Sequence, residues 1–316
     1  MQKRFFTLLL VSTIVIAVSG LALGANSSTV TQNGLDNTAT VNQVGSDNLT
    51  EAYQQGNENI ASQDQLGSNN EGYIEQVGNK NIADQWQVDV LITIYNLAKI
   101  YQEGIENYAY QEQHGNKNEA YIDQICSKNI ASQTQTGEEN IANIYQHGAS
   151  NFGSQIQSGN KNYAEIHTGC SYNQAIQSQI LGDENYAFIG QYDDWDIAMQ
   201  FQTGNKNWAE IKQWTNQNFS QQTQAGDENW ARIWQLGGDQ NTATQTQTGG
   251  NGNHADIYQN GELNFALQSQ NGNNNYALLT QNGNNNKCWQ YQTGDGHSSP
   301  VTQTGDGNSV TITQGP

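Results

Sequence analysis

The side chains that most often perform chemistry are spread thinly over this chain. Its cysteines are three in number, and its histidines fall on different repeats and never cluster. The histidines are His114, His147, His167, His254 and His297. Metal sites and catalytic constellations need several such groups together. The sequence therefore predicts no cofactor, no metal site and no enzymatic activity.

Acidic residues are the remaining candidates, and several of them lie in turns, as in GDEN around Asp227 and GDGN around Asp306. Carboxylate oxygens suit calcium, but the nonapeptide pattern of calcium-binding rolls is missing. Turn chemistry explains these residues adequately. With 30 acidic and 11 basic residues, a nucleic-acid partner is excluded, because phosphate contacts need clustered Lys and Arg.

A short repeat organises nearly the whole chain. The pattern N-x-(small)-x-x-x-Q-x-G recurs every 11 residues, with its asparagines at Asn129, Asn140, Asn151 and Asn162. The recurring residues within one unit stand at steps of two, and a period of two predicts a β-strand. The glycine that follows predicts the bend, because glycine tolerates backbone angles that other residues do not.

A second, longer period becomes visible four residues after each asparagine. Ile122, Ile144 and Ile166 alternate there with Gln133 and Gln155, so the true repeat has 22 residues. Strand, turn, strand, turn is one coil of a solenoid whose strands pair with their equivalents in the next coil. The predicted fold is all-β, a parallel β-solenoid of about twelve such coils with two facing parallel sheets.

The recurring residues share one strand face, which we expect to be the interior, since the intervening positions hold charged and variable residues. Buried amides need partners, and identical amides stacked at the coil spacing can bond to one another. The predicted structural ladder consists of Asn118, Asn129, Asn140, Asn151, Asn162, Gln113, Gln124, Gln133, Gln135, Gln146, Gln155, Gln157, Ile122, Ile144 and Ile166.

Two segments are predicted at the N-terminal side of the chain. Residues 1–25 have the pattern of a signal peptide, since Lys3 and Arg4 precede an apolar run. A retained membrane anchor is the alternative, because the run is about long enough to cross a bilayer. Residues 26–316 form the repeat solenoid, which either alternative puts outside the cytoplasm.

Two irregularities interrupt the repeat. Four extra residues in the turn near 88–95 are interpreted as a bulged turn and not as a binding element. Cys126 and Cys170 both occupy the glycine position of a turn, two coils or about 9.6 Å apart, which is too far for a disulfide. Cys288 occupies a small interior position.

The stretch 129–157, NIASQTQTGEENIANIYQHGASNFGSQIQ, resembles the curlin repeat, because Gln135, Gly137, Asn140 and Gln146 fall at its spacing. The resemblance extends over roughly residues 30 to 314. It implies a stacked β-solenoid that is secreted unfolded, nucleated outside the cell and elongated end to end. The implied partners are further copies of the chain itself, a nucleator and a secretion pore.

We therefore expect a secreted structural protein that assembles into curli-like amyloid fibres of the extracellular matrix or biofilm and supports adhesion and aggregation at the cell surface. Both ends of the repeat region are poor in charge, and neither has a helical cap that would block stacking. The alternative is a monomeric solenoid adhesin that binds carbohydrate or surfaces. It would use outward aromatic rows that include Trp208 and Trp230.

Overall fold

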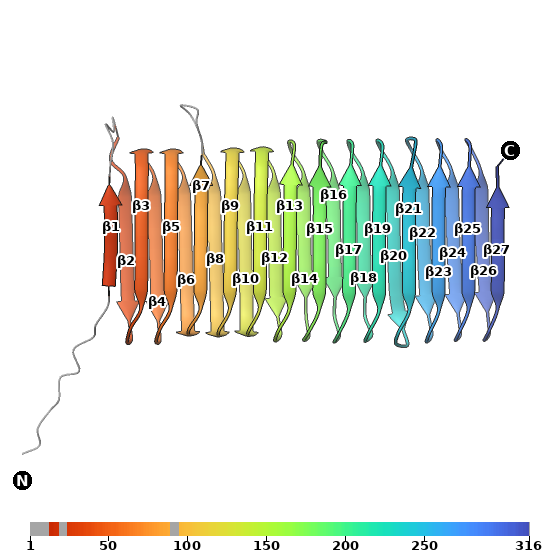
Figure 1. Ribbon diagram of the computed structural model, residues 1–316, viewed down its shortest axis with the longest axis horizontal. Helices are drawn as coiled ribbons and strands as arrows, with labels where there is room; N and C mark the ends of the chain where they lie inside the picture. Colours follow the sequence, from red (N-terminus) through yellow and green to blue (C-terminus); the bar gives the residue numbers. More distant parts are fainter. Residues whose placement is uncertain (1–12, 19–23, 89–94, 316) are drawn as a thin grey trace, which may run out of the picture.

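The computed structural model describes residues 13–18, 24–88 and 95–315, and every regular element in them is a strand (Figure 1). The odd-numbered strands form one 14-stranded parallel sheet. Its strands are β1 (Thr13–Val18), β3 (Thr38–Ser46), β5 (Ile60–Ser68), β7 (Ile82–Val88), β9 (Tyr108–Asn116), β11 (Ile130–Glu138), β13 (Phe152–Ser158), β15 (Gln174–Ile180), β17 (Ile197–Thr203), β19 (Phe219–Ala225), β21 (Thr242–Thr248), β23 (Phe265–Asn271), β25 (Lys287–Thr293) and β27 (Ser309–Gln314).

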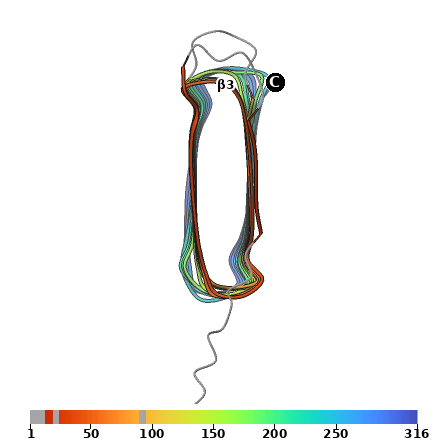
Figure 2. The same cartoon turned by 90° about the vertical axis from the view of Figure 1, so that its left-hand side faces the viewer.

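The even-numbered strands form the facing sheet of 13 parallel strands. These are β2 (Ser27–Asn33), β4 (Leu49–Gln55), β6 (Glu71–Asn79), β8 (Leu97–Ile105), β10 (Glu119–Ser127), β12 (Ile141–His147), β14 (Tyr163–Thr168), β16 (Tyr186–Gln191), β18 (Trp208–Gln213), β20 (Trp230–Gly237), β22 (His254–Asn260), β24 (Tyr276–Asn282) and β26 (Ser298–Thr304). Seen along the rod, the coils superimpose as a flattened ring (Figure 2).

The predicted fold class is confirmed. Each strand pairs in parallel with the strand one coil away, and Ile122 lies beside Ile144 as Gln133 lies beside Gln155. The strands β2 to β27 make about 13 coils instead of the predicted twelve. The last coil departs from the repeat, with Pro300 and Ile312 in its strands, but it pairs in full register with the coil before it.

Alternation along each strand explains why these residues form sheets. In β13 the burial pattern alternates between outward Phe152, Ser154 and Ile156 and fully buried Gln155 and Gln157. A strict period of two with β-branched and aromatic residues outside suits a pleated strand. The interior of the odd sheet is lined by glutamine and that of the even sheet by isoleucine.

The turns are fixed by two backbone positions. The turn glycine has a positive φ, as at Gly137 with +119°, and a Cβ there would lie 2.0 Å from the carbonyl oxygen of Gly159 in the next coil. Only glycine fits this approach without strain. Cys126 occupies the same position with a φ of +81°. The residue before each asparagine is left-handed, as at Lys161 with a φ of +56°.

The left-handed turn position carries alternating charge along one edge of the rod. All its members between β9 and β20 have φ near +57°, and lysine alternates with glutamate from coil to coil. They are Lys117, Glu139, Lys161, Glu184, Lys206 and Glu228. The Lys117 Nζ donates to the Glu139 Oε1 across 3.2 Å. Each charge thus has opposite charges in the neighbouring coils.

The insertion near 88–95 falls largely on 89–94, which lie outside the described residues. Strands β7 and β9 keep full register on either side, and Gln87 donates to Gln113 as in the regular coils. The predicted leader contributes β1, whose backbone pairs in parallel with β3 from Thr13 opposite Thr38 to Val18 opposite Gln43. Among the described residues there is no helix long and apolar enough to span a membrane.

Candidate functional site

The histidines lie at separate places on the outer surface. His114, His147 and His167 each contact a carboxylate of the same face, and the His114 Nε2 lies 2.7 Å from Glu112. Within the part of the chain that the structure describes, no hydroxyl or thiol hydrogen-bonds to these rings. They therefore form carboxylate pairs on the surface and not a nucleophile and base.

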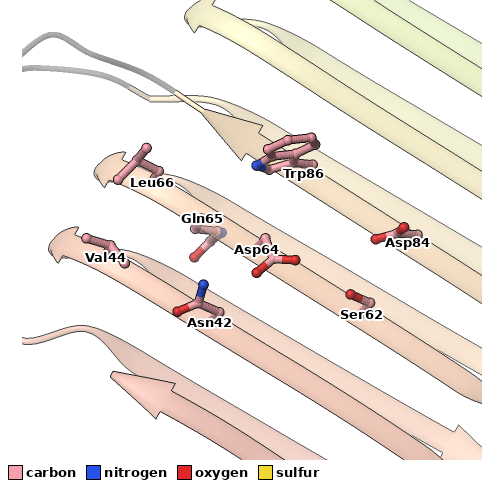
Figure 3. Close-up of a pocket in the computed structure, with 8 residues that line it drawn as sticks. All are labelled: Asn42, Val44, Ser62, Asp64, Gln65, Leu66, Asp84 and Trp86. Carbon is pink, nitrogen blue, oxygen red and sulfur yellow. The ribbon is translucent and has the colours of Figure 1, made fainter. Parts of the chain in front are cut away.

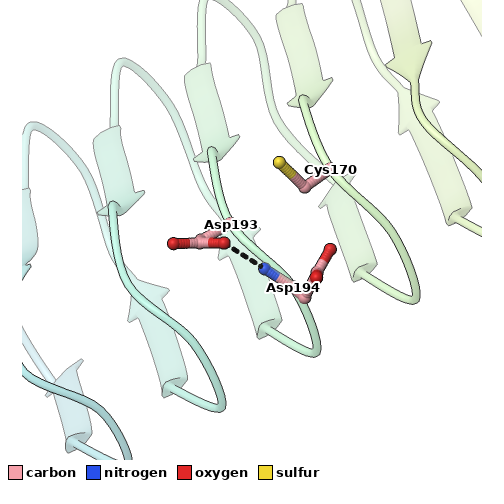
Figure 4. A group of neighbouring side chains, drawn as sticks. All are labelled: Cys170, Asp193 and Asp194. Atoms are coloured by element: carbon pink, nitrogen blue, oxygen red, sulfur yellow. Dashed lines mark hydrogen bonds between the residues drawn. The ribbon is translucent and has the colours of Figure 1, made fainter.

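One turn brings three potential metal ligands together (Figure 4). Ligand atoms of Cys170, Asp193 and Asp194 all lie within 4.8 Å of one another. However, Asp194 Oδ1 accepts the Ser171 N–H at 2.6 Å, and Asp193 Oδ1 accepts the Asp194 N–H at 3.1 Å. Burial and the neighbouring carboxylates raise the pKa of the Cys170 thiol, which keeps it protonated. This turn satisfies its own backbone.

A shallow hollow lies on the outer face of β3, β5 and β7 (Figure 3). Leu66 and Trp86 supply its apolar wall, and Asp64 and Asp84 supply two carboxylates. Burial raises the pKa of Asp84, while the Ser62 hydroxyl hydrogen-bonds to it and lowers the pKa. The eight lining residues include no cation and no imidazole, so they do not make a hydrolytic site.

The asparagine ladders are the first continuous polar feature of the interior. The Asn140 N–H and Nδ2 both donate to Asn118 Oδ1 at 3.1 Å, and the same Nδ2 donates to the Gly159 carbonyl of the next coil at 2.8 Å. Asn162 repeats these contacts on Asn140. On the other edge, the Asn151 N–H donates to Asn129 Oδ1 at 3.1 Å. Each side chain joins three successive coils.

The glutamine side chains form three further ladders. Gln113 donates to Gln135 and Gln135 to Gln157 at 2.9 and 3.0 Å, Gln133 donates to Gln155 at 2.9 Å, and Gln124 donates to Gln146 at 2.9 Å. The structure adds a contact that the sequence does not reveal, because every Nε2 also donates to a backbone carbonyl outside its ladder. The Gln133 Nε2, for example, donates to the Tyr121 oxygen of the facing strand at 3.0 Å. The ladders thus tie the two sheets together.

All residues of the predicted structural ladder lie inside the rod. The exposed fraction of each of them is 1% or less. Ile122, Ile144 and Ile166 lie beside one another in successive even strands and pack against the alanine rows. Amide ladders and an isoleucine column therefore share one core, which is dry enough for each amide bond to count at close to its full strength.

Thr168 interrupts the glutamine ladder of the even sheet. It lies between Gln146 and Gln191 in register. Its Oγ1 and the Gln191 Oε1 are both buried without a hydrogen-bond partner. A threonine is too short to bridge the coil spacing, so the ladder is broken at this point.

Replacing Thr168 by Gln is expected to close this ladder and stabilise the rod by about 1 to 3 kcal/mol, the typical cost of an unpaired buried polar group. The new side chain would accept from Gln146 and donate to Gln191. Urea unfolding of the variant and of an outward control, Thr136→Gln, measures the difference. Equal stability of the two variants would contradict the assignment.

Asp196 occupies an asparagine position of the ladder and is fully buried. Its Oδ1 accepts the Asn218 N–H at 2.8 Å, but its Oδ2 and the Asn173 Nδ2 have no partner. Burial raises the pKa of Asp196 to about 8, and the carboxylates of Asp193 and Asp239 add to the effect. Sequence reasoning did not single out this residue, although counting the 22-residue register does find an Asp in an Asn position.

Outward aromatic residues of the even sheet form a continuous stack over six coils. The ring centroids are 4.0 to 5.8 Å apart, and the angles between neighbouring planes run from 2° to 26°. The stacked rings are Tyr163, Tyr186, Trp208, Trp230, His254 and Tyr276. Because each ring covers the face of the next, the row does not offer the open ring faces that a stacked sugar would need.

Comparison with known proteins identifies the repeat. The chain matches the curlin associated repeat four times, at residues 45–78, 96–125, 250–283 and 291–315. All four matches fall on strand–turn–strand units of the solenoid. No curated protein matches the chain. The predicted relationship to the curlin repeat is confirmed.

Proposed function

We propose that this curlin-repeat chain is a secreted structural subunit that stacks end to end into amyloid fibres outside the cell. The observation that carries this proposal is the match between the two ends of the rod. The rod closes on an even and then an odd strand, β26 and β27, and it opens on an even and then an odd strand, β2 and β3. A second copy would therefore continue both sheets without a gap.

The terminal even strands are nearly the same sequence. Strand β26 reads SSPVTQT and strand β2 reads SSTVTQN. Stacked in the register of the other coils, Val301 would lie on Val30 and Gln303 on Gln32 of the next copy. The Gln32 Oε1 is buried without a donor, whereas every regular ladder supplies one from the preceding coil. The Gln303 Nε2 of another copy is the group that the ladder calls for.

The terminal odd strands replace the usual glutamine by apolar residues. Val41 of β3 and Ile312 of β27 stand where the other odd strands carry the ladder glutamine. Ile312, Val310 and Val30 are only partly buried in the single rod. Stacking would bury them, each contributing on the order of 1 kcal/mol. The joint would thus be more apolar than the body of the rod.

The predicted leader bears on this joint. Its strand β1 pairs with β3, which is the edge that β27 of another copy would need. Removal of residues 1–25 would free that edge, so that growth would follow secretion and cleavage. Purified mature protein is expected to give a meridional reflection at 4.7 to 4.8 Å and to elongate seeds. Soluble monomers that fail both tests would leave the adhesin function as the better proposal.

Pro300 weakens the proposed joint. Tyr276 donates its N–H to the His297 oxygen of β26, and in a parallel ladder the same residue position of β26 points its own N–H onward, away from β24. Ser298, Pro300 and Thr302 therefore face the open edge, and proline has no N–H to donate there. One backbone hydrogen bond of the joint would be missing, a feature that restrains edge pairing.

Replacing Pro300 by Thr, the residue that β2 has at position 29, is expected to restore this bond. A gain of about 1 kcal/mol lowers the soluble concentration left after seeded growth roughly fivefold. Ser298→Thr is the matched control, because it adds a similar side chain to the same strand without adding an N–H. If the two variants leave the same soluble concentration, growth does not use the edge of β26.

A further inference from the structure

The outer face of the odd sheet is uncharged over a long stretch. From β11 to β23, a stretch described without a gap, none of the outward side chains of the seven odd strands is charged. The residues are mainly Ile, Phe, Thr and Ser, as in Phe152, Ile156, Phe201 and Phe219. Among them, Ile130 is 44% exposed and Ile156 is 46% exposed. We refer to this surface, the outward side of odd strands β11 to β23, as the neutral face.

The opposite surface of the same coils is different in kind. The even strands β14 to β22 present Glu165, Glu210, Lys212, Arg232 and Asp256 outward. The chain as a whole has a formal charge of −19, and its turns hold many of the acidic residues. The absence of charge from the described neutral face is therefore specific to one side of the rod.

We propose that the neutral face is a lateral interface between two copies of the chain, which pack their odd sheets face to face. Seven strands at about 4.8 Å and seven residues at about 3.3 Å cover roughly 34 by 23 Å, or about 800 Å². A stable protein interface buries about 800 Å² from each partner. The neutral face is thus large enough by itself for a specific pair.

The regular spacing of the neutral face indicates a second copy as its partner. Its rows of small and branched side chains repeat once per coil, and a surface with the same repeat is the odd sheet of another rod. Two such sheets can interdigitate without voids, as in the dry interfaces between paired β-sheets. This association does not depend on end-to-end growth, so it extends beyond the proposed function.

The charges that border the neutral face favour an antiparallel pair. Asp84 and Glu112 lie on β7 and β9 at one border, and Lys287 lies on β25 at the other. Strand β17 is midway between β9 and β25 in the sheet order. A two-fold axis through β17 would set the acidic border of each copy against the border of its partner that carries Lys287. Parallel rods would instead set the acidic borders against each other.

A matched pair of threonines tests the proposal. Thr223 of β19 lies on the neutral face, and Thr280 of β24 holds the equivalent outward position on the even sheet. Thr223→Lys is expected to halve the mass per unit length of the fibres in scanning transmission electron microscopy, because an unpaired charge would be buried between the sheets. Thr280→Lys is expected to leave the value of the wild type, which is twice that of a single rod.

Further measurements keep the outcome decisive. Ile156→Lys is a second variant on another strand of the neutral face and is expected to act like Thr223→Lys. Where rods do not polymerise, sedimentation of the mature chain at micromolar concentration gives the same comparison as dimer against monomer. A single-rod mass for the wild type overturns the proposal, and so does an equal effect of lysine at positions 223 and 280.

Discussion

Replacing Gln155 by Glu is expected to destabilise the mature rod by about 3 to 5 kcal/mol at neutral pH, the cost of an uncompensated buried charge. The Gln155 Nε2 donates to Gln177 Oε1 at 2.8 Å and to the Asn143 carbonyl at 2.9 Å. A carboxylate would turn an oxygen toward both acceptors. Its other oxygen would still accept from Gln133, so the ladder would lose two bonds and gain a buried charge.

The loss is expected to shrink in acid. Burial disfavours the ionised form, so the folded pKa of the introduced carboxyl would lie above its unfolded value of about 4.3. Its protonated form therefore stabilises the fold relative to the ionised form below about pH 4.3, and that stability is lost as the pH rises through the folded pKa. Assembly should slow in parallel, since strands must enter the ladder in order to add to a fibre.

The control for this variant is Ser154→Glu, because Ser154 is the outward neighbour of Gln155 on β13. It adds the same charge to the same strand while leaving the ladder intact. Urea unfolding at pH 7 and pH 4 measures both variants. If Gln155→Glu costs no more than Ser154→Glu, the amide ladder does not carry the stability assigned to it.

The second large effect concerns Asp196, whose replacement by Asn is expected to stabilise the rod at pH 7 by roughly 2 to 4 kcal/mol. The Oδ2 of Asp196 is buried without a partner, whereas an asparagine Nδ2 at this position donates to the carbonyl of the next coil, as Asn151 does to Cys170 at 2.6 Å. The variant would give the ladder its usual donor and remove a buried acid.

The pH dependence identifies the group. The folded pKa of Asp196 is raised to about 8, above an unfolded value of about 3.9. The wild type therefore keeps its full stability below about pH 4 and loses up to about 1.4 kcal/mol per pH unit as the pH rises toward 8. The difference in melting temperature between Asp196→Asn and the wild type should grow over the same interval.

A nearby carboxylate provides the control for this experiment. Asp194 lies in the same turn and is only partly buried, and an asparagine there would keep the acceptor that Ser171 uses. Asp194→Asn is expected to leave the pH profile of the wild type unchanged. A difference between Asp196→Asn and the wild type that stays constant from pH 4 to pH 8 would show that Asp196 does not titrate in this range.

Much of the fold could be predicted because the repeat states its own register. The alternation of Ile144 and Gln155 in one position distinguishes two kinds of strand, and the steps of two after Asn140 distinguish inside from outside. Local pattern and global fold agree in every coil, which is the condition under which sequence reasoning succeeds. The number of coils was one short, since Pro300 and Ile312 do not follow the pattern.

The remaining features depend on distances that no spacing reveals. The bond from Gln133 to the Tyr121 carbonyl crosses between the sheets, and it requires the separation of the sheets to be known. The stacking of Trp208 on Trp230, with centroids 4.8 Å apart, requires the rotamers of the rings. The neutral face emerged only when odd and even strands were assigned to opposite surfaces, because along the chain charged and uncharged strands alternate.

The lysines and glutamates that alternate at the left-handed turn positions limit how such a rod can change its length. Between Lys117 and Glu228, loss or duplication of one coil would set two like charges about 4.8 Å apart. Gain or loss of two adjacent coils would leave the alternation intact. In this stretch the heritable unit is therefore the pair of coils, and length variants produced by recombination should differ by even numbers of coils.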